Sequence, residues 1–216
     1  PVDNAGSDQS LFQCTPTQIC WPASCADADG NLISCSMISS PGSYDGTQIC
    51  FTPTVSGSFQ FILKSTDACG ATGYDTAVIQ VTINDAPVCH VPNDTTIFQC
   101  SASQICLPAF ATDANGNLKS CSIISGPGSL VNGNWCYTPS SSQLATVVVS
   151  CEDSCGAVCQ SQFSVNIKVN SAPTITFAQY NPLFLCAPQQ VCLDYSASDP
   201  DAPRPVTITL TGGGTL

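Results

Sequence analysis

The chain has 216 residues, of which 16 are cysteine and one is histidine, and its net charge is −11. The acidic balance argues against nucleic acid and anionic lipid as partners. So many cysteines with so little histidine favour disulfides in an extracellular or cell-surface location over zinc sites. No stretch is long and apolar enough to cross a membrane.

Short runs of β-forming residues, separated by turn signals such as Asp29-Gly30 and Pro41-Gly42, follow one another along the chain. No window has a helical period, and Thr76–Ile83 alternates polar and apolar residues as a half-buried strand does. In the first 86 residues, the predicted strands are Thr17–Trp21, Leu32–Ile38, Gln48–Phe51, Gly57–Leu63 and Thr76–Ile83. In the next 86, they are Gln104–Leu107, Leu118–Ile124, Asn134–Tyr137, Ala145–Ser150 and Gln162–Val169.

The sequence repeats with a period of 86 residues. Cys14 recurs as Cys100 and Cys186, and Cys20 recurs as Cys106 and Cys192. A fixed long period indicates one folding unit used several times, so we predict modules at 1–86 and 87–172 and the first half of a third at 173–216. We expect an all-β, disulfide-rich protein of tandem immunoglobulin-like β-sandwiches, and a segment of a larger secreted protein.

Several short motifs recur in the same order in successive repeats. The first repeat has Asp27-Ala-Asp-Gly-Asn-Leu, Cys50-Phe-Thr-Pro and Val81-Thr-Ile-Asn-Asp-Ala-Pro-Val, and the second has Thr112-Asp-Ala-Asn-Gly-Asn-Leu and Cys136-Tyr-Thr-Pro. In order and spacing, these motifs resemble the bacterial cadherin-like, tandem-repeat immunoglobulin-like modules of large surface proteins, in a cysteine-rich variant. The resemblance implies stalks, adhesins and extracellular assemblies rather than an enzyme.

The repeat also suggests how the cysteines pair. The third segment has two cysteines, which we pair with each other, and the period extends that pairing to the other repeats. The remaining pairs follow from recurrence in both repeats, from the expected proximity of loops at one end of an immunoglobulin-like sandwich, and from assigning what is left. The predicted disulfides are Cys14–Cys20, Cys25–Cys69, Cys35–Cys50, Cys89–Cys155, Cys100–Cys106, Cys121–Cys136, Cys151–Cys159 and Cys186–Cys192.

Acidic and amide side chains gather where one repeat passes into the next, and the cadherin-like resemblance suggests calcium there. Calcium binds six to eight oxygens from carboxylates, carbonyls and water. The alternative is ordinary turn chemistry, in which Asp and Asn bond nearby backbone. The candidate ligands are Asn84, Asp85, Asp113, Asn115, Asn117 and Asp153, and the corresponding positions elsewhere are Asn170, Asp199 and Asp201, and Asp27, Asp29, Asn31 and Asp67.

Asn93-Asp94-Thr95 is an N-glycosylation sequon, and abundant Ser and Thr would also allow O-linked sugar, although these residues are equally suited to strands and turns. Trp21 and Trp135 could be sugar platforms, but their place in strand patterns favours the core. No constellation of catalytic residues is present, so we do not expect an enzyme.

The incomplete third module bears most directly on function. An incomplete sandwich exposes strand edges, which are templates for another chain, and strand addition from a neighbouring copy would build an open filament. Continuation of the chain past Leu216 would complete the module equally well. We therefore expect a structural subunit of an extracellular filament or stalk, with copies of itself or continuing repeats as partners and glycans attached. An adhesin that binds carbohydrate or a host surface is the alternative.

Overall fold

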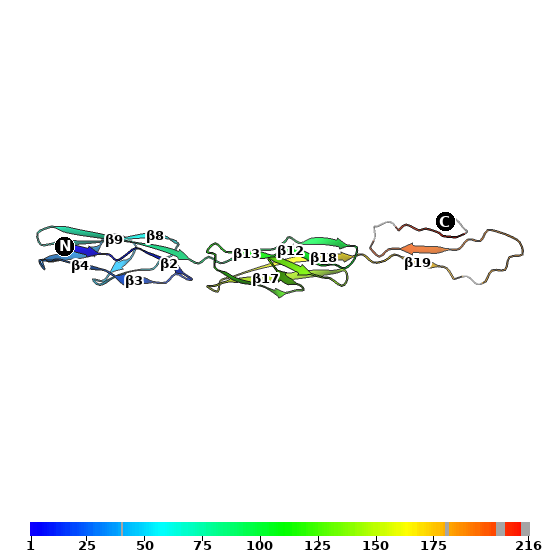
Figure 1. The fold of residues 1–216 in the computed structure, drawn as a ribbon, viewed down its shortest axis with the longest axis horizontal. Coiled ribbons are helices and arrows are strands. Elements are labelled where there is room, and N and C mark those ends of the chain that lie inside the picture. Colours follow the sequence, from blue (N-terminus) through cyan, green and yellow to red (C-terminus); the bar gives the residue numbers. More distant parts are fainter. Residues whose placement is uncertain (40, 180–181, 202–205, 213–216) are drawn as a thin grey trace. The chain divides into compact units, whose positions relative to one another are not determined.

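The computed structural model describes residues 1–39, 41–179, 182–201 and 206–212. Throughout these residues the regular structure consists of β-strands, as predicted (Figure 1). A search of the described residues for a helix long and apolar enough to cross a membrane finds none.

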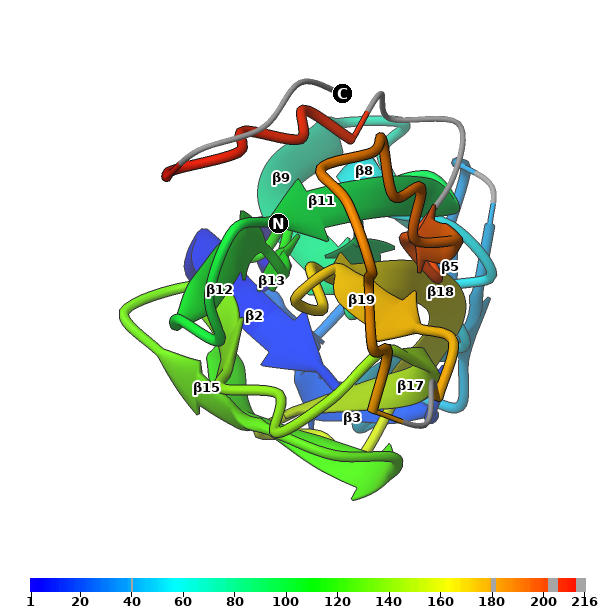
Figure 2. The ribbon, with the colours of Figure 1, turned by 90° about the vertical axis from the view of Figure 1, so that its right-hand side faces the viewer.

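The first repeat is a β-sandwich of three small sheets. Their strand orders are β2-β9-β8-β5, β3-β7-β6 and β1-β4. The strands are β1 (Val2–Asn4), β2 (Gln9–Gln13), β3 (Ile19–Pro22), β4 (Ser24–Ala26), β5 (Leu32–Met37), β6 (Ser43–Tyr44), β7 (Gln48–Phe51), β8 (Gly57–Asp67) and β9 (Thr72–Ile83). β8 and β9 form a long antiparallel hairpin and run side by side (Figures 1 and 2), whereas β2 joins β9 in parallel.

The second repeat has the same topology, shifted by one period. Its sheets are β11-β18-β17-β14, β12-β16-β15 and β10-β13, and β11 is parallel to β18. The strands are β10 (Val88–His90), β11 (Thr95–Gln99), β12 (Ile105–Pro108), β13 (Phe110–Thr112), β14 (Leu118–Ser125), β15 (Ser129–Val131), β16 (Asn134–Tyr137), β17 (Gln143–Asp153) and β18 (Val158–Val169).

The third segment repeats one pairing of the earlier sandwiches. β19 (Thr174–Phe177) pairs antiparallel with β20 (Tyr195–Ser198), as β1 pairs with β4. Parts of the predicted half-module, residues 180–181, 202–205 and 213–216, lie outside the described residues.

Each sandwich is held by an apolar core between its sheets. In β8 and β9, alternate residues turn inward, and Phe61, Leu63, Ile79 and Val81 are almost fully buried. The period-2 pattern that predicted Thr76–Ile83 as a strand is the pattern of this burial. The short strands β1, β2, β4 and β6 were not predicted, because their residues carry little apolar alternation.

The two cores use aromatic residues at different positions. In the first repeat Trp21 meets Phe61 edge to face at 4.9 Å, and the corresponding residues of the second repeat are Leu107 and Val147. In the second repeat Trp135 meets Phe163 edge to face at 5.4 Å. The corresponding residues of the first repeat are Ile49 and Ala77. One Trp–Phe pair therefore fills each core, from a different pair of strand positions.

The chain divides into two compact units whose bounds differ from those of the repeats. Unit 1 comprises Pro1–Val88, Thr112–Ser120 and Cys151–Cys159, and unit 2 comprises Cys89–Ala111, Cys121–Ser150 and Gln160–Leu216. Two loops of the second repeat thus belong to the same unit as the linker that precedes them. The repeat bounds 1–86, 87–172 and 173–216 remain a sequence prediction.

Candidate functional site

A relay of polar side chains in unit 1 joins the linker after β9 to two loops of the second repeat. Asn84 Nδ2 donates to Asp153 Oδ2 at 2.7 Å, and Asn117 Nδ2 donates to Asn84 Oδ1 at 2.7 Å. Asp153 is fully buried, and its Oδ1 accepts the backbone N–H groups of Cys155 and Ala157, both at 2.8 Å. The Asn84 amide, helped by these N–H groups, holds the pKa of Asp153 below its usual value.

The far end of the relay is one donor short. The amide atom of Asn117 that faces Asp113 lies 2.7 Å from Asp113 Oδ1. While Asn117 Nδ2 donates to Asn84, that atom is an oxygen facing a carboxylate. Reversing the Asn117 amide moves the oxygen–oxygen contact to Asn84, whose Nδ2 is already used by Asp153. One oxygen pair in the relay therefore lacks a proton or a cation in either orientation.

The remaining two predicted ligands meet through the backbone. The N–H of Asp85 donates to Asn115 Oδ1 at 2.6 Å. The same contact recurs one period later in unit 2, where the N–H of Ser171 donates to Asp201 Oδ2. Asp201 is held in turn by its own N–H donating to Asp199 Oδ1 at 2.8 Å. A linker N–H bonded to the Asp/Asn loop is therefore a repeated feature of this chain.

The corresponding loops of the first repeat are built in the same way. Asp67 Oδ1 accepts the N–H groups of Cys69 and Ala71, at 2.9 and 2.8 Å. The N-terminal nitrogen of Pro1 lies 3.0 Å from Asp27 Oδ2, which lowers the pKa of Asp27 and raises that of the amine. Asn31 Oδ1 is buried with no hydrogen-bond partner in the described part of the chain. This orphaned oxygen corresponds to the unmatched oxygen of Asn117.

The predicted calcium ligands come together, but their atoms fit a calcium cage poorly. Both Asp153 oxygens already accept N–H donors, and Asn115 Oδ1 already accepts the backbone N–H of Asp85. Asp113 and Asn117 retain one unmatched oxygen pair, far fewer oxygens than calcium prefers. Hydrogen bonding accounts for the side chains of Asn84, Asn115 and Asp153, and no step of the proposed function passes through calcium.

The cysteine pairing differs from the prediction, because the register of paired strands decides which cysteines lie opposite one another. Cys20 on β3 lies opposite Cys50 on β7 and is bonded to it, with Cα atoms 4.2 Å apart. Cys106 and Cys136 repeat this arrangement at the same Cα separation. The predicted pairs Cys14–Cys20, Cys35–Cys50, Cys100–Cys106 and Cys121–Cys136 are wrong. In the first repeat the expected partners belong to different sheets: Cys14 follows β2 and Cys35 is on β5, whereas Cys20 and Cys50 are in the β3-β7-β6 sheet.

Two further disulfides also correct the prediction. Cys25 on β4 is bonded to Cys35 on β5, across ten residues, instead of to Cys69. Cys14 is bonded to Cys155, 141 residues away, so the predicted Cys89–Cys155 pair is wrong as well. Cys14 follows β2, and Cys155 lies in the β17–β18 turn held by Asp153, so these ends meet within unit 1.

Four cysteines are free thiols in this structure, and all are exposed: Cys69, Cys100, Cys186 and Cys192. The predicted Cys186–Cys192 bond is therefore absent. Four others, Cys89, Cys121, Cys151 and Cys159, are disulfide-bonded. The predicted Cys151–Cys159 pair stays a prediction.

The predicted carbohydrate features separate into exposed and buried residues. Asn93 is exposed, just before β11, and therefore open to modification. Trp21 and Trp135 are buried, with their indole N–H groups donating to the carbonyls of Ala5 and Pro127 at 2.7 and 2.8 Å. These tryptophans are core residues and offer no exposed platform for sugar.

No sequence-family profile and no curated protein matches the chain. Solved structures with a similar fold include the protocadherin gamma B4 extracellular domain, at TM-score 0.58 and 13% identity over 92% of this chain and 38% of that one. Domains 1–5 of protocadherin gamma B2 match at TM-score 0.56 and 16% identity over 91% of this chain and 45% of that one. Human protocadherin-24 EC1-2 matches at TM-score 0.56 and 16% identity over 79% of this chain and 99% of that one.

This likeness establishes the fold: tandem β-sandwich modules of the cadherin and immunoglobulin-like type. The chain spans less than half the length of the protocadherin gamma B2 and gamma B4 structures. The predicted fold class is confirmed, and twelve disulfide-bonded cysteines favour an extracellular protein.

Proposed function

We propose that this chain is a structural segment of an extracellular filament or surface stalk. Mechanical load along it would be carried by β-sandwich repeats. Disulfides stabilise each repeat internally, and polar linkers join one repeat to the next. The observation that carries the proposal is the state of the third segment. It reproduces the start of a sandwich, yet it leaves the core-facing side of that sandwich uncovered.

The exposed positions correspond to buried positions of the first repeat. Leu193 and Tyr195 are 56% and 42% exposed, whereas the corresponding Trp21 and Ala23 are 5% and 3% exposed. Phe177, at 60%, corresponds to fully buried Ala5. Apolar side chains at core positions seek cover, because burying them contributes about 25 cal/mol per Å². The segment is therefore suited to accept further strands.

Strand addition is the form of cover that suits this segment. β19 and β20 form a two-stranded sheet, and such a pair is only marginally stable by itself. Strands that complete the sandwich would pair the edges and cover the apolar residues together. Further strands of the same chain would give a continuous stalk, and strands of a neighbouring copy would give a polymer that grows in one direction.

Self-association of the purified chain tests the polymer form. We would follow molar mass by light scattering and morphology by electron microscopy. The wild type should form concentration-dependent oligomers or fibres. A Phe177→Ser/Leu193→Ser variant should stay monomeric, and the matched control Ile38→Ser/Val55→Ser, exposed in the first repeat, should associate like the wild type. A wild type that remains monomeric at all concentrations contradicts the polymer form. The continuous stalk then remains, and fibres in the native material would support it.

Glycosylation at Asn93 is part of the same proposal. The residue is exposed, and the following Asp94 is fixed by accepting the Ser164 N–H at 2.7 Å. A sugar there would shield a surface of the second repeat without entering its core. Mass spectrometry of the native protein before and after enzymatic removal of N-glycans tests it, with Asn93→Gln as the control.

A second candidate function, binding carbohydrate or a surface ligand, has one observation in its favour. His90 stacks on half-exposed Phe110, with ring centroids 5.0 Å apart, beside a shallow hollow that includes Pro92 and Asn93. Saturable binding to a glycan array that is lost in Phe110→Ala would support this candidate.

A further inference from the structure

We propose that the Cys14–Cys155 disulfide is one instance of a staple that recurs at every passage from one repeat to the next, so that Cys100 and Cys69 are half-staples for further repeats. Cys100 would bond the cysteine of an Asp-x-Cys-Gly hairpin in a following repeat. Cys69 would bond a cysteine placed like Cys14 in a preceding repeat. This inference rests on the proposed role as a repeat array.

The two free thiols stand at the periodic positions of the two bonded cysteines. Cys100 lies one period after Cys14, and Cys69 lies one period before Cys155. Cys14 and Cys155 are bonded, whereas Cys100 and Cys69 are exposed thiols. The position one period after Cys155 lies outside residues 1–216, and in this proposal another repeat would supply the matching hairpin for Cys100.

The hairpin turns that carry Cys69 and Cys155 are built in the same way. Asp67 fixes the turn of Cys69 as Asp153 fixes the turn of Cys155, through the same pair of backbone N–H groups. The same type of asparagine contact accompanies each sulfur. Asn31 Nδ2 lies 3.9 Å from Cys69 Sγ, and Asn117 Nδ2 lies 3.8 Å from Cys155 Sγ. Cys69 is thus presented as Cys155 is.

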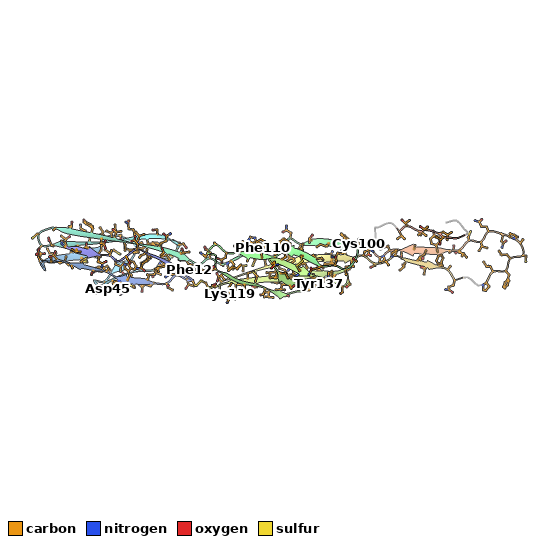
Figure 3. The ribbon with its side chains drawn as sticks, in the orientation of Figure 1. Phe12, Asp45, Cys100, Phe110, Lys119 and Tyr137 are labelled. Atoms are coloured by element: carbon orange, nitrogen blue, oxygen red, sulfur yellow. A yellow bond between two sulfur atoms is a disulfide. The ribbon has the colours of Figure 1, made fainter. Side chains whose placement is uncertain are left out.

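The partner position is also reproduced. The residue before each cysteine accepts the linker backbone: Asn84 N–H donates to the Gln13 carbonyl at 2.9 Å, and Asn170 N–H donates to the Gln99 carbonyl at 2.8 Å. Cys100 follows Gln99 at the end of the second repeat from which the chain continues to residues 173–216 (Figure 3). The Ser171 N–H donates to Asp201, as the Asp85 N–H donates to Asn115 one period earlier. The two backbone contacts of the linker therefore recur at this passage, at Asn170 and at Ser171.

The bond forms by two thiol–disulfide exchanges with a small disulfide oxidant of the glutathione class. The Cys100 thiolate attacks the oxidant, expelling one thiol and giving a mixed disulfide. The hairpin thiolate then attacks the Cys100 sulfur, expelling the second thiol. The two protein thiols lose two protons and two electrons in total, and the oxidant is reduced to two thiols.

Disulfide mapping of the native material tests the staple. The protein is alkylated without reduction, digested and sequenced by mass spectrometry. Cys100 should be recovered linked to an Asp-x-Cys-Gly peptide and Cys69 to a peptide resembling Phe12–Thr15. Recovery of Cys100 or Cys69 as an alkylated thiol, or of Cys100 bonded to Cys186 or Cys192, overturns the proposal.

The source of the hairpin follows from the mass of the same material. Identical mass in reducing and non-reducing gels places the staple within one chain, whereas a ladder that collapses on reduction places it between copies. Both outcomes support the staple. Its failure is distinguishable from failure of the proposed function, because the association of Phe177 and Leu193 is measured without reference to any disulfide.

Discussion

The first and second repeats share one backbone plan but fill it differently. Strand order, the parallel β2–β9 and β11–β18 pairs, and the cross-strand Cys20–Cys50 and Cys106–Cys136 bonds coincide. The Trp–Phe pair of each core, in contrast, sits at different positions. Backbone pairing and the cross-strand disulfide are therefore common to the two repeats, whereas core side chains differ in compensating sets.

Exchanging the core pairs is the strongest test of that comparison. Trp21→Leu with Phe61→Val should destabilise the first repeat by about 4 kcal/mol, because large side chains leave a cavity. Adding Ile49→Trp and Ala77→Phe copies the core of the second repeat and should recover most of the loss. Thermal unfolding followed by calorimetry measures both. If the fourfold variant is less stable than the double variant, the cores are not interchangeable.

Removing the cross-strand disulfide should cost both repeats alike. Each bond closes 30 residues, for which the chain-entropy model gives about 3.6 kcal/mol. We expect Cys20→Ala/Cys50→Ala and Cys106→Ala/Cys136→Ala to lower the free energy of unfolding by similar amounts in denaturant titrations. A large difference between these two variants would show that the shared register is used differently in the two repeats.

Glycine distinguishes the repeats at one position. Gly6 has a φ of +93°, and a Cβ added there would lie 2.6 Å from Trp21 Cδ1. The second repeat has Pro92 at that position and Leu107 in place of the tryptophan. Gly6→Ala should cost about 3 kcal/mol through strain and overpacking.

The tryptophan supplies the control for this prediction. In a Trp21→Leu background the clash is removed and the backbone strain remains, so Gly6→Ala should cost about 1 kcal/mol. Denaturant unfolding of the four chains completes the cycle. An equal cost in both backgrounds would mean that Trp21 does not impose the glycine.

The sequence predicted what depends on local pattern and failed where distant segments meet. Alternation over Thr76–Ile83 located the end of β9, the predicted strand Gly57–Leu63 covers the start of β8, and the cysteine period predicted the repeats. The disulfides depended on register: that Cys20 faces Cys50 follows from the pairing of β3 with β7, which no local signal specifies. The Cys14–Cys155 bond could not be predicted for the same reason, because it joins segments 141 residues apart.

The candidate site was predicted in its membership but not in its chemistry. Asn84, Asp113, Asn117 and Asp153 do gather, because the period places linker and loops alike in each repeat. Which atoms face one another depends on side-chain orientation. The use of both Asp153 oxygens by N–H donors could not be read from residue types.

The two linkers differ in what their asparagine side chains bond. Asn84 Nδ2 donates to the buried carboxylate of Asp153, whereas Asn170 Nδ2 donates to a backbone carbonyl. The lowered pKa of Asp153 contributes stability above the ordinary Asp pKa of about 3.9, which is lost as the pH falls through the folded-state pKa. Asn84→Ala should lower the melting temperature at pH 7, and the difference from wild type should shrink below about pH 4. Asn170→Ala, whose Nδ2 donates to the Ser171 carbonyl, is the matched control. A pH-independent difference would exclude Asp153 as the cause.

The smallest effect concerns the unmatched oxygen pair of Asp113 and Asn117. Asp113→Asn can place its amide N–H at the Oδ2 position, 3.3 Å from the Asn117 atom that faces it, while Oδ1 still accepts the Asn115 N–H. The variant should gain about 0.5–1 kcal/mol if the pair lacks only a donor, and calcium or a chelator should not move its melting temperature or that of the wild type. Asp27→Asn, at the same place in the first repeat, is the comparison. Loss of stability in Asp113→Asn, with a calcium-dependent rise in the wild type alone, would instead identify a cation between these oxygens and restore the cadherin-like expectation.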